Sequence, residues 1–242
     1  MPEDLQEIRT KAVDDFLKAV YSLQQQTDPV PTTLLAQTLK ISAPSVTDMV
    51  KRLAGIDDEH LHHISIPLLE YEPYHGVRLS PDGKKIALEV IRHHRLLELY
   101  LVQNLGYSWD EVHEEAERLE HHISEKLEAR IASALGNPQI DPHGDPIPAP
   151  DGTIASRDLV ELAELAINQD ATVSRIVDQH PEVLRYLSDL GLTPGATIQL
   201  AQRAPLNDTV TLRITNGEPH TISTQLARQI LVTPLARYRP KK

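Results

Sequence analysis

The sequence has no cysteine among its 242 residues. This absence excludes disulfide bonds, thiolate zinc sites and a cysteine nucleophile. No apolar run reaches the roughly 18 residues that a membrane-spanning helix needs, so no membrane association is expected. The charged N-terminal segment, MPEDLQEIRTK, also lacks the apolar stretch of a signal peptide. These absences predict a cytoplasmic protein.

The chain also lacks an excess of positive charge, since its formal net charge is −11. Residues 1–88 contain nine Lys and Arg against thirteen Asp and Glu. This balance argues against a protein that coats nucleic acid by charge alone, although a small local basic surface is compatible with it. Specific DNA binding would require the doubled contacts of a dimer. The G-x-S-x-G motif of hydrolases and the Gly-rich loops that bind phosphate are absent as well.

The N-terminal third has the pattern of a winged helix-turn-helix. Apolar residues recur at helical spacing over 4–25, a short helix is expected over 33–39, and Ser42 is a plausible N-cap for a third helix that ends near Ala54. Two strands are expected over 64–71 and 76–79. The alternative is a helical packing motif that does not touch DNA. If it does bind DNA, the third helix would enter a major groove. Its candidate contacts are Ser42, Pro44, Ser45 and Asp48 at the base edges, and Lys51 and Arg52 at the phosphates.

After the N-terminal third, the sequence pattern changes from helical to Pro- and Gly-rich and then to β-like. A long helix is expected to follow Ser80 and to end near Asn104, and a second helix should begin after Ser108. Residues 136–152 are rich in Pro and Gly, which predicts either a linker or an ordered irregular loop. Short β-like runs over 196–201, 209–214, 220–223 and 229–232 then predict a small β-barrel. The fold class is mainly α with a small β part.

Histidines and carboxylates recur at helical spacing between residues 94 and 121. His94 and Glu98 are four residues apart, and His113, Glu117, Glu120 and His121 follow at i, i+4, i+7 and i+8. Imidazole and carboxylate together, without sulfur, suit Mn(II), Fe(II) or Zn(II). The alternative is a solvated helix face held by i,i+4 ion pairs. His60, His62 and His63 are expected to lie in an exposed loop.

Several segments together resemble the diphtheria toxin repressor family of metal-dependent transcriptional regulators, and the resemblance covers nearly the whole chain. The segments are DDFLKAVYSL (14–23), ISAPSVTDMVKRL (41–53), LSPDGKKIA (79–87), RHHRLLE (92–98), EVHEEAERLEHHIS (111–124), DPHGDPIP (141–148) and YLSDLGLTPGATIQL (186–200). The resemblance implies a DNA-binding domain over 1–83, a helical metal-binding and dimerisation domain over 84–140, a connector over 141–170 and an SH3-like domain over 171–242. This last domain is similar to ferrous-transport accessory proteins.

The resemblance also implies two metal sites. The primary, activating site falls on Asp15, Glu117, Glu120 and His121, and the ancillary site on His94, Glu98 and His113. His180 and Glu182 are weaker candidates for ligands from the SH3-like domain. Iron-type members have Met and Cys at the positions of Asp15 and Glu117, so oxygen donors here favour Mn(II), with Fe(II) as the alternative. Lys18 stands where manganese-type two-domain members have a second acidic residue, which argues against a binuclear site.

The function implied is a metal-activated repressor that binds operator DNA as a homodimer and controls metal-uptake genes. Two other classes stay open at this point: a metalloenzyme with a carboxylate and histidine site in a helical domain, and a metal-storage protein. Because no further acid–base set accompanies the metal-type residues, the sequence favours a regulator over an enzyme.

Overall fold

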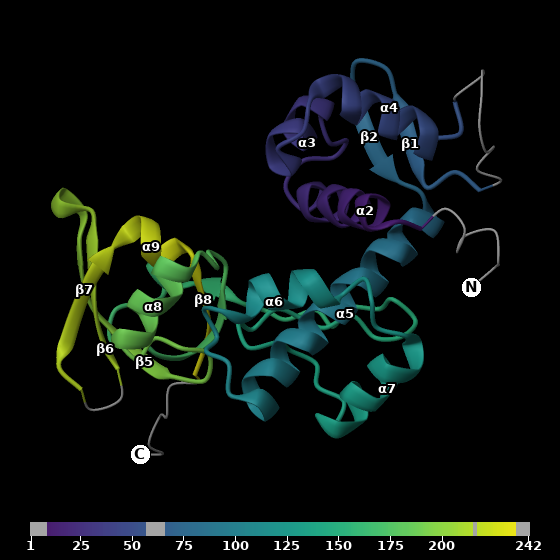
Figure 1. Cartoon of the computed structure of the whole chain (residues 1–242). Helices are drawn as coiled ribbons and strands as arrows, with labels where there is room; N and C mark the ends of the chain where they lie inside the picture. Colours follow the sequence, from purple (N-terminus) through teal and green to yellow (C-terminus); the bar gives the residue numbers. More distant parts are fainter. Residues whose placement is uncertain (1–8, 57–65, 215–216, 236–242) are drawn as a thin grey trace. The chain divides into compact units, whose positions relative to one another are not determined.

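The computed structural model describes residues 9–56, 66–214 and 217–235 (Figure 1). The chain forms two compact units, and each is described by itself. One unit holds the chain up to His93 together with residues 120–123 and 148–153. The other holds residues 94–119, 124–147 and the C-terminal part. Within the described ranges, no helix combines the length and apolar character needed to cross a bilayer.

The first unit starts with the predicted helix-turn-helix. Its helices are α2 (Lys11–Gln24), α3 (Thr32–Leu39) and α4 (Ala43–Leu53). The chain leaves α3 through Lys40, whose φ of 54° is left-handed and ends the helix. Ser42 then caps α4 as predicted, because its side chain accepts a hydrogen bond from the backbone N–H of Ser45.

A two-stranded hairpin completes this domain. β1 (Leu69–Glu72) pairs in antiparallel fashion with β2 (Gly76–Leu79), and Val30 forms a further bridge to Val77. The hairpin lies against α2 and α4 (Figure 1), and all three contribute to one buried core. The expected first strand therefore begins later than residue 64. Residues 64–65 and the histidines His60, His62 and His63 lie outside the described part of the chain.

Three helices follow the hairpin: α5 (Pro81–Leu105), α6 (Val112–Leu119) and α7 (Glu125–Ala134). Ser80 caps α5, since its Oγ accepts a hydrogen bond from the backbone N–H of Gly83 at 3.1 Å. Both His94 and Glu98 are buried on α5. The sequence analysis did not predict α7, although its N-cap Ser124 is of the usual type.

The C-terminal domain is a six-stranded antiparallel sheet in the order β3-β8-β4-β5-β6-β7. Its strands are β3 (Val160–Glu161), β4 (Asp170–Ile176), β5 (Thr197–Ala204), β6 (Thr209–Ile214), β7 (Pro219–Ser223) and β8 (Ile230–Pro234), with α8 (Pro181–Asp189), α9 (Thr224–Arg228) and the 3₁₀ turns Leu162–Glu164 and Pro205–Asn207 between them. The four predicted β runs match β5 to β8. Among the described residues, the strand pairings form one continuous sheet with β3 and β7 at its ends.

The Pro- and Gly-rich segment is an ordered loop rather than a flexible linker. Oδ1 of Asp141 accepts hydrogen bonds from the backbone N–H groups of His143 and Asp145, at 2.8 and 2.9 Å. The backbone N–H of Ile176 on β4 donates to the carbonyl oxygen of His143 at 2.9 Å. The loop is therefore attached to the sheet through the polypeptide backbone, and it presents its side chains in fixed directions.

Candidate metal centre

The histidine and carboxylate stripe is divided because α6 ends at Leu119. Glu117 remains on the helix, whereas Glu120 and His121 lie in the turn that follows. The expected single face over residues 113–121 is thus replaced by two groups that point to different surroundings. No glycine or proline marks this helix end in the sequence, so spacing alone could not reveal it.

The first cluster joins α2 to the turn after α6. Asp15, Glu120 and His121 each offer a ligand atom, and these atoms lie within 4.8 Å of one another. Nε2 of His121 is 2.9 Å from Oδ1 of Asp15 and 3.3 Å from Oε1 of Glu120. The side chains of His121 and Glu120 are 4% and 0% exposed. Three of the four residues expected in the primary site are therefore brought together.

Two cationic groups and one further carboxylate surround this cluster. Nζ of Lys18 donates to both carboxylate oxygens of Glu120 at 2.9 Å. Asp14, which the sequence analysis did not single out, is buried and lies 3.5 Å from Nδ1 of His121 through its Oδ2. Arg9 pairs with Asp14 in turn, at 3.1 Å. A carboxylate on the second ring nitrogen is the usual way in which a metal-binding histidine is oriented.

The second cluster contains the three residues expected in the ancillary site, together with Glu117. Oε1 of Glu98 is 2.9 Å from Nε2 of His94 and 3.4 Å from Nδ1 of His113. Oε1 of Glu117 lies 3.8 Å from His94 and 3.9 Å from His113. Glu117 therefore groups with the histidines of α5 and α6, and not with the primary set to which the resemblance assigned it.

A third cluster, missed by the sequence analysis, shares Glu98 with the second. Glu98, Asp141 and His143 are all buried, and their ligand atoms lie within 4.8 Å of one another. Nε2 of His143 is 2.7 Å from the carbonyl oxygen of Trp109, so Nε2 carries the proton. Nδ1 has no hydrogen-bond partner among the described residues and lies 3.6 Å from Oε2 of Glu98. This is the arrangement of a histidine prepared to ligate through Nδ1.

Burial and neighbouring charges shift the pKa values in this third cluster. Burial disfavours ionised Glu98, but the charge of His94 and the interactions with His113 and His143 outweigh it and lower the pKa of Glu98 well below its usual range. Burial likewise opposes protonation of His143, yet the interaction with Glu98 raises its pKa. Burial, with the charges of Asp145 and Glu98, raises the pKa of Asp141 to about 7. Glu98 is therefore an ionised, buried carboxylate with imidazoles on both sides.

The donor chemistry of these clusters fits divalent first-row metal ions. The ligand atoms are carboxylate oxygens and imidazole nitrogens, and the sequence contains no cysteine. The buried Nδ1 of His143 faces the carboxylate of Glu98 without a hydrogen bond, and this pair of donor atoms fits a divalent cation. Such ligands suit Mn(II) and Fe(II) and do not select Cu(I).

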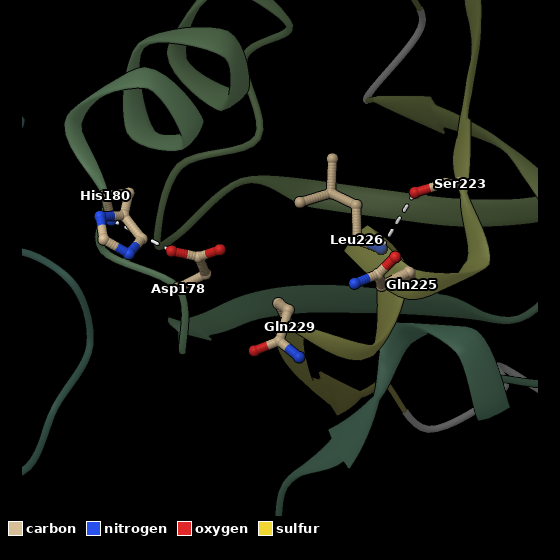
Figure 2. Close-up of a pocket in the computed structure, with 6 residues that line it drawn as sticks. All are labelled: Asp178, His180, Ser223, Gln225, Leu226 and Gln229. Atoms are coloured by element: carbon tan, nitrogen blue, oxygen red, sulfur yellow. Dashed lines mark hydrogen bonds between the residues drawn. The ribbon is translucent and has the colours of Figure 1, made fainter. Parts of the chain in front are cut away.

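The weaker candidates from the SH3-like domain lie elsewhere. His180 is the N-cap residue of α8, and its backbone N–H donates to Oδ1 of Asp178 at 3.1 Å. Both residues line a pocket of about 390 Å³ with Ser223, Gln225, Leu226 and Gln229 (Figure 2). Neither His180 nor Glu182 belongs to a described group of three metal-type ligands. This domain instead reaches the connector through Arg175, whose Nη2 is 2.6 Å from Oδ1 of Asp145.

The six predicted DNA contacts lie on α4 and at its N-cap. All six side chains are exposed, and α4 buries only Val46, Val50 and Leu53. Its surface residues Ser42, Pro44, Ser45, Asp48, Lys51 and Arg52 are those that the sequence analysis assigned to bases and phosphates. A recognition helix needs such a face free of packing contacts.

Three family models match three successive parts of the chain. Residues 10–63 match the N-terminal DNA-binding domain of iron-dependent repressors. Residues 80–149 match the metal-binding and dimerisation domain of the same repressors. Residues 160–234 match the FeoA domain.

Individual relatives extend over nearly the whole chain. The iron-dependent repressor IdeR of Mycobacterium leprae (strain TN) is 30% identical over 229 residues, which are 90% of this chain and 94% of that protein. A solved structure of a manganese-dependent transcriptional repressor in complex with manganese is 35% identical, with a TM-score of 0.80, and covers 92% of this chain and 100% of its own. The structure of the repressor ScaR with bound Cd²⁺ is 30% identical, with a TM-score of 0.73. The match covers 94% of this chain and 100% of the ScaR chain.

The helix-turn-helix and the buried metal-type clusters together define a metal-dependent transcriptional repressor. The chain belongs to the family of the iron-dependent and diphtheria toxin repressors. These relatives are repressors and not enzymes, and the matched DNA-binding domain and metal-binding and dimerisation domain support a metal cofactor, DNA and a second copy as partners.

Proposed function

We propose that this protein is a manganese-activated repressor, with Fe(II) as the alternative activator, and that its dimer binds a palindromic operator of metal-uptake genes. The observation that carries the choice of metal is the first cluster, in which Asp15, Glu120 and His121 offer oxygen and nitrogen donors only. Hard oxygen donors favour Mn(II) over metals that prefer sulfur. We assign the primary site to these three residues and the ancillary site to His94, Glu98, His113, Asp141 and His143.

The primary site connects the DNA-binding domain to a later part of the chain. Asp15 lies on α2, which packs in the core of the helix-turn-helix, while Glu120 and His121 follow α6. A divalent cation supplies the positive charge that lets these side chains stay close together. Binding would favour the conformation in which α2 is held to the turn, and so would shift a two-state equilibrium towards the DNA-binding form.

Lys18 gives this site a built-in positive charge. Its ammonium group hydrogen-bonds both oxygens of Glu120, at the position where the resemblance would require an acidic residue for a second ion. The arrangement supports one ion in the primary site. Lys18 also compensates part of the charge of Glu120 before the metal binds, so the metal-free protein can keep its fold.

The test is a fluorescence-anisotropy titration of an operator that is first selected from genomic DNA. We expect binding with Mn(II), at least tenfold weaker binding with chelator, and a strong dependence on salt. Asp15→Asn and His121→Ala should remove the effect of the metal while circular dichroism stays native, and His94→Ala should have a milder effect. Operator affinity that is the same with and without metal would refute the proposal.

A further inference from the structure

The exposed face of α4 is centred on an acidic residue. At 3.6 residues per turn, Asp48 lies opposite the buried residues Val46, Val50 and Leu53. Pro44 and Lys51 lie one turn before and almost one turn after it on the same face, and both are exposed. A helix that enters a major groove by this face would bring the carboxylate of Asp48 to the base edges.

The other short polar side chains of α4 already have partners within the helix. Oγ of Ser42 accepts from the backbone N–H of Ser45 and lies 2.7 Å from the Oγ of the same residue. Oγ1 of Thr47 donates to the carbonyl oxygen of Ala43 at 3.0 Å. These hydroxyl groups hold the first turns of the helix together, and forming a contact with a base would compete with that role.

Asp48 differs because it has no hydrogen bond or ion pair with any other residue that the structure describes. An unpaired carboxylate on the surface that faces phosphates weakens DNA binding through repulsion. The residue is therefore unfavourable at this position unless it accepts hydrogen bonds from a base.

We propose that Asp48 is a specificity-determining residue that reads a cytosine in each half of the operator. An ionised carboxylate can only accept hydrogen bonds. In the major groove, the donors are N4 of cytosine and N6 of adenine, and adenine places its N7 acceptor beside N6, where it repels a carboxylate. Cytosine is the base whose edge suits Asp48. This inference rests on the proposed function, since it requires that α4 enters DNA.

Asp48→Asn is the sharpest variant because it keeps the size of the side chain and adds a donor. Asparagine can bond N6 and N7 of adenine together, so the preferred base should change from cytosine to adenine. Binding sites would be selected from a randomised duplex library with Mn(II)-loaded wild type, Asp48→Asn and Asp48→Ala. Asp189→Asn, an exposed residue of α8, is the control with the same change of charge.

We expect wild type and Asp189→Asn to select the same motif, with cytosine preferred about tenfold at one position in each half-site. Asp48→Asn should prefer adenine there. Asp48→Ala should lose the preference, because it loses the hydrogen bond to cytosine and binds sequences without that cytosine somewhat more tightly. If the Asp48 variants select the wild-type base at every position, the inference is wrong and the repressor function stands. If wild type selects no motif, both proposals fail together.

Discussion

At the scale of single residues, the unusual feature is a carboxyl group buried among other acids. Burial, Asp145 and Glu98 together raise the pKa of Asp141 to about 7, against 3.8 in the unfolded chain. Two arginines offset part of this charge, since Arg95 lies 3.7 Å from Asp141 and Arg175 lies 2.6 Å from Asp145. The loop therefore keeps a negative charge, and its burial lowers the free energy of unfolding of the metal-free protein.

Asp141→Asn should change how the stability of the metal-free protein depends on pH. Because the folded pKa of Asp141 is raised, its contribution to stability is complete below pH ~4 and is lost as the pH rises through ~7. The asparagine variant lacks this loss, so in chelator its free energy of unfolding should fall less between these pH values, by an amount on the order of 4 kcal/mol. Asparagine can still accept the backbone hydrogen bonds that Oδ1 receives.

Urea unfolding of the full chain at several pH values would measure this difference, with Asp189→Asn as the control. Glu98 has the opposite effect on the pH dependence of stability, because a carboxyl group with a lowered pKa stabilises the folded protein at higher pH. Glu98 is present in every variant compared. Parallel stability curves for wild type and Asp141→Asn would contradict the assigned role of Asp141.

The sequence identified the ligand types well but their grouping only in part. Helical spacing paired His94 with Glu98, the resemblance added His113 to this set, and the structure brings the three together. The resemblance assigned Glu117 to the primary set, and the end of α6, which separates it from Glu120 and His121, has no local signal. Asp141 and His143 were missed because a loop has no periodicity from which the directions of its side chains can be predicted.

At the scale of elements, the connector loop is held against β4 by a close backbone approach. A Cβ atom on Gly144 would lie 2.0 Å from the carbonyl oxygen of Ser174, and its φ of +89° is unfavourable for other residues. Arg157 also donates to the carbonyl oxygen of Gly144, at 2.9 Å. The sheet thus positions the loop that carries Asp141 and His143.

Gly144→Ala should therefore destabilise the protein strongly and weaken the ancillary metal site. Gly136→Ala is a matched control, because its φ is +74° and no atom lies within 4 Å of the added Cβ. We expect about 1 kcal/mol of destabilisation for the control and roughly 3 kcal/mol or more for Gly144→Ala, where the backbone must move. Urea unfolding with chelator and Mn(II) titration followed by electron paramagnetic resonance would measure the two effects. Equal losses in both variants would show that the contact with Ser174 is unimportant.

Elements with local signals were predictable, and those that depend on distant pairing were not. The cap at Ser42 and the apolar spacing of α4 lie within a few residues, so the helix-turn-helix was predicted closely. The closure of the C-terminal sheet depends on which strands become neighbours, and β3 and β4 were not predicted at all. The SH3-like character of this domain was predicted from strand spacing and the resemblance, but the order of its strands was not.

At the scale of the whole molecule, a net charge of −11 opposes approach to DNA. Binding then depends on a few local cations and on the charge that metal ions add. Lys51 is one such cation, because it is exposed on α4 beside Asp48 and has no ion pair with other described residues. Its assigned role is to contact a phosphate, which carries no sequence information.

Lys51→Ala should weaken binding to all DNA sequences equally and reduce the salt dependence of the affinity. Each lost phosphate contact lowers the slope of log K against log salt by about one, so a dimer should lose about two. Lys85→Ala makes the same change in net charge at an exposed position of α5 and should leave the slope nearly unchanged. Anisotropy titrations with Mn(II) between about 50 and 200 mM salt, on operator and random duplexes, provide both slopes. If the two variants change the slope equally, the overall charge governs binding and α4 does not contact the phosphates through Lys51.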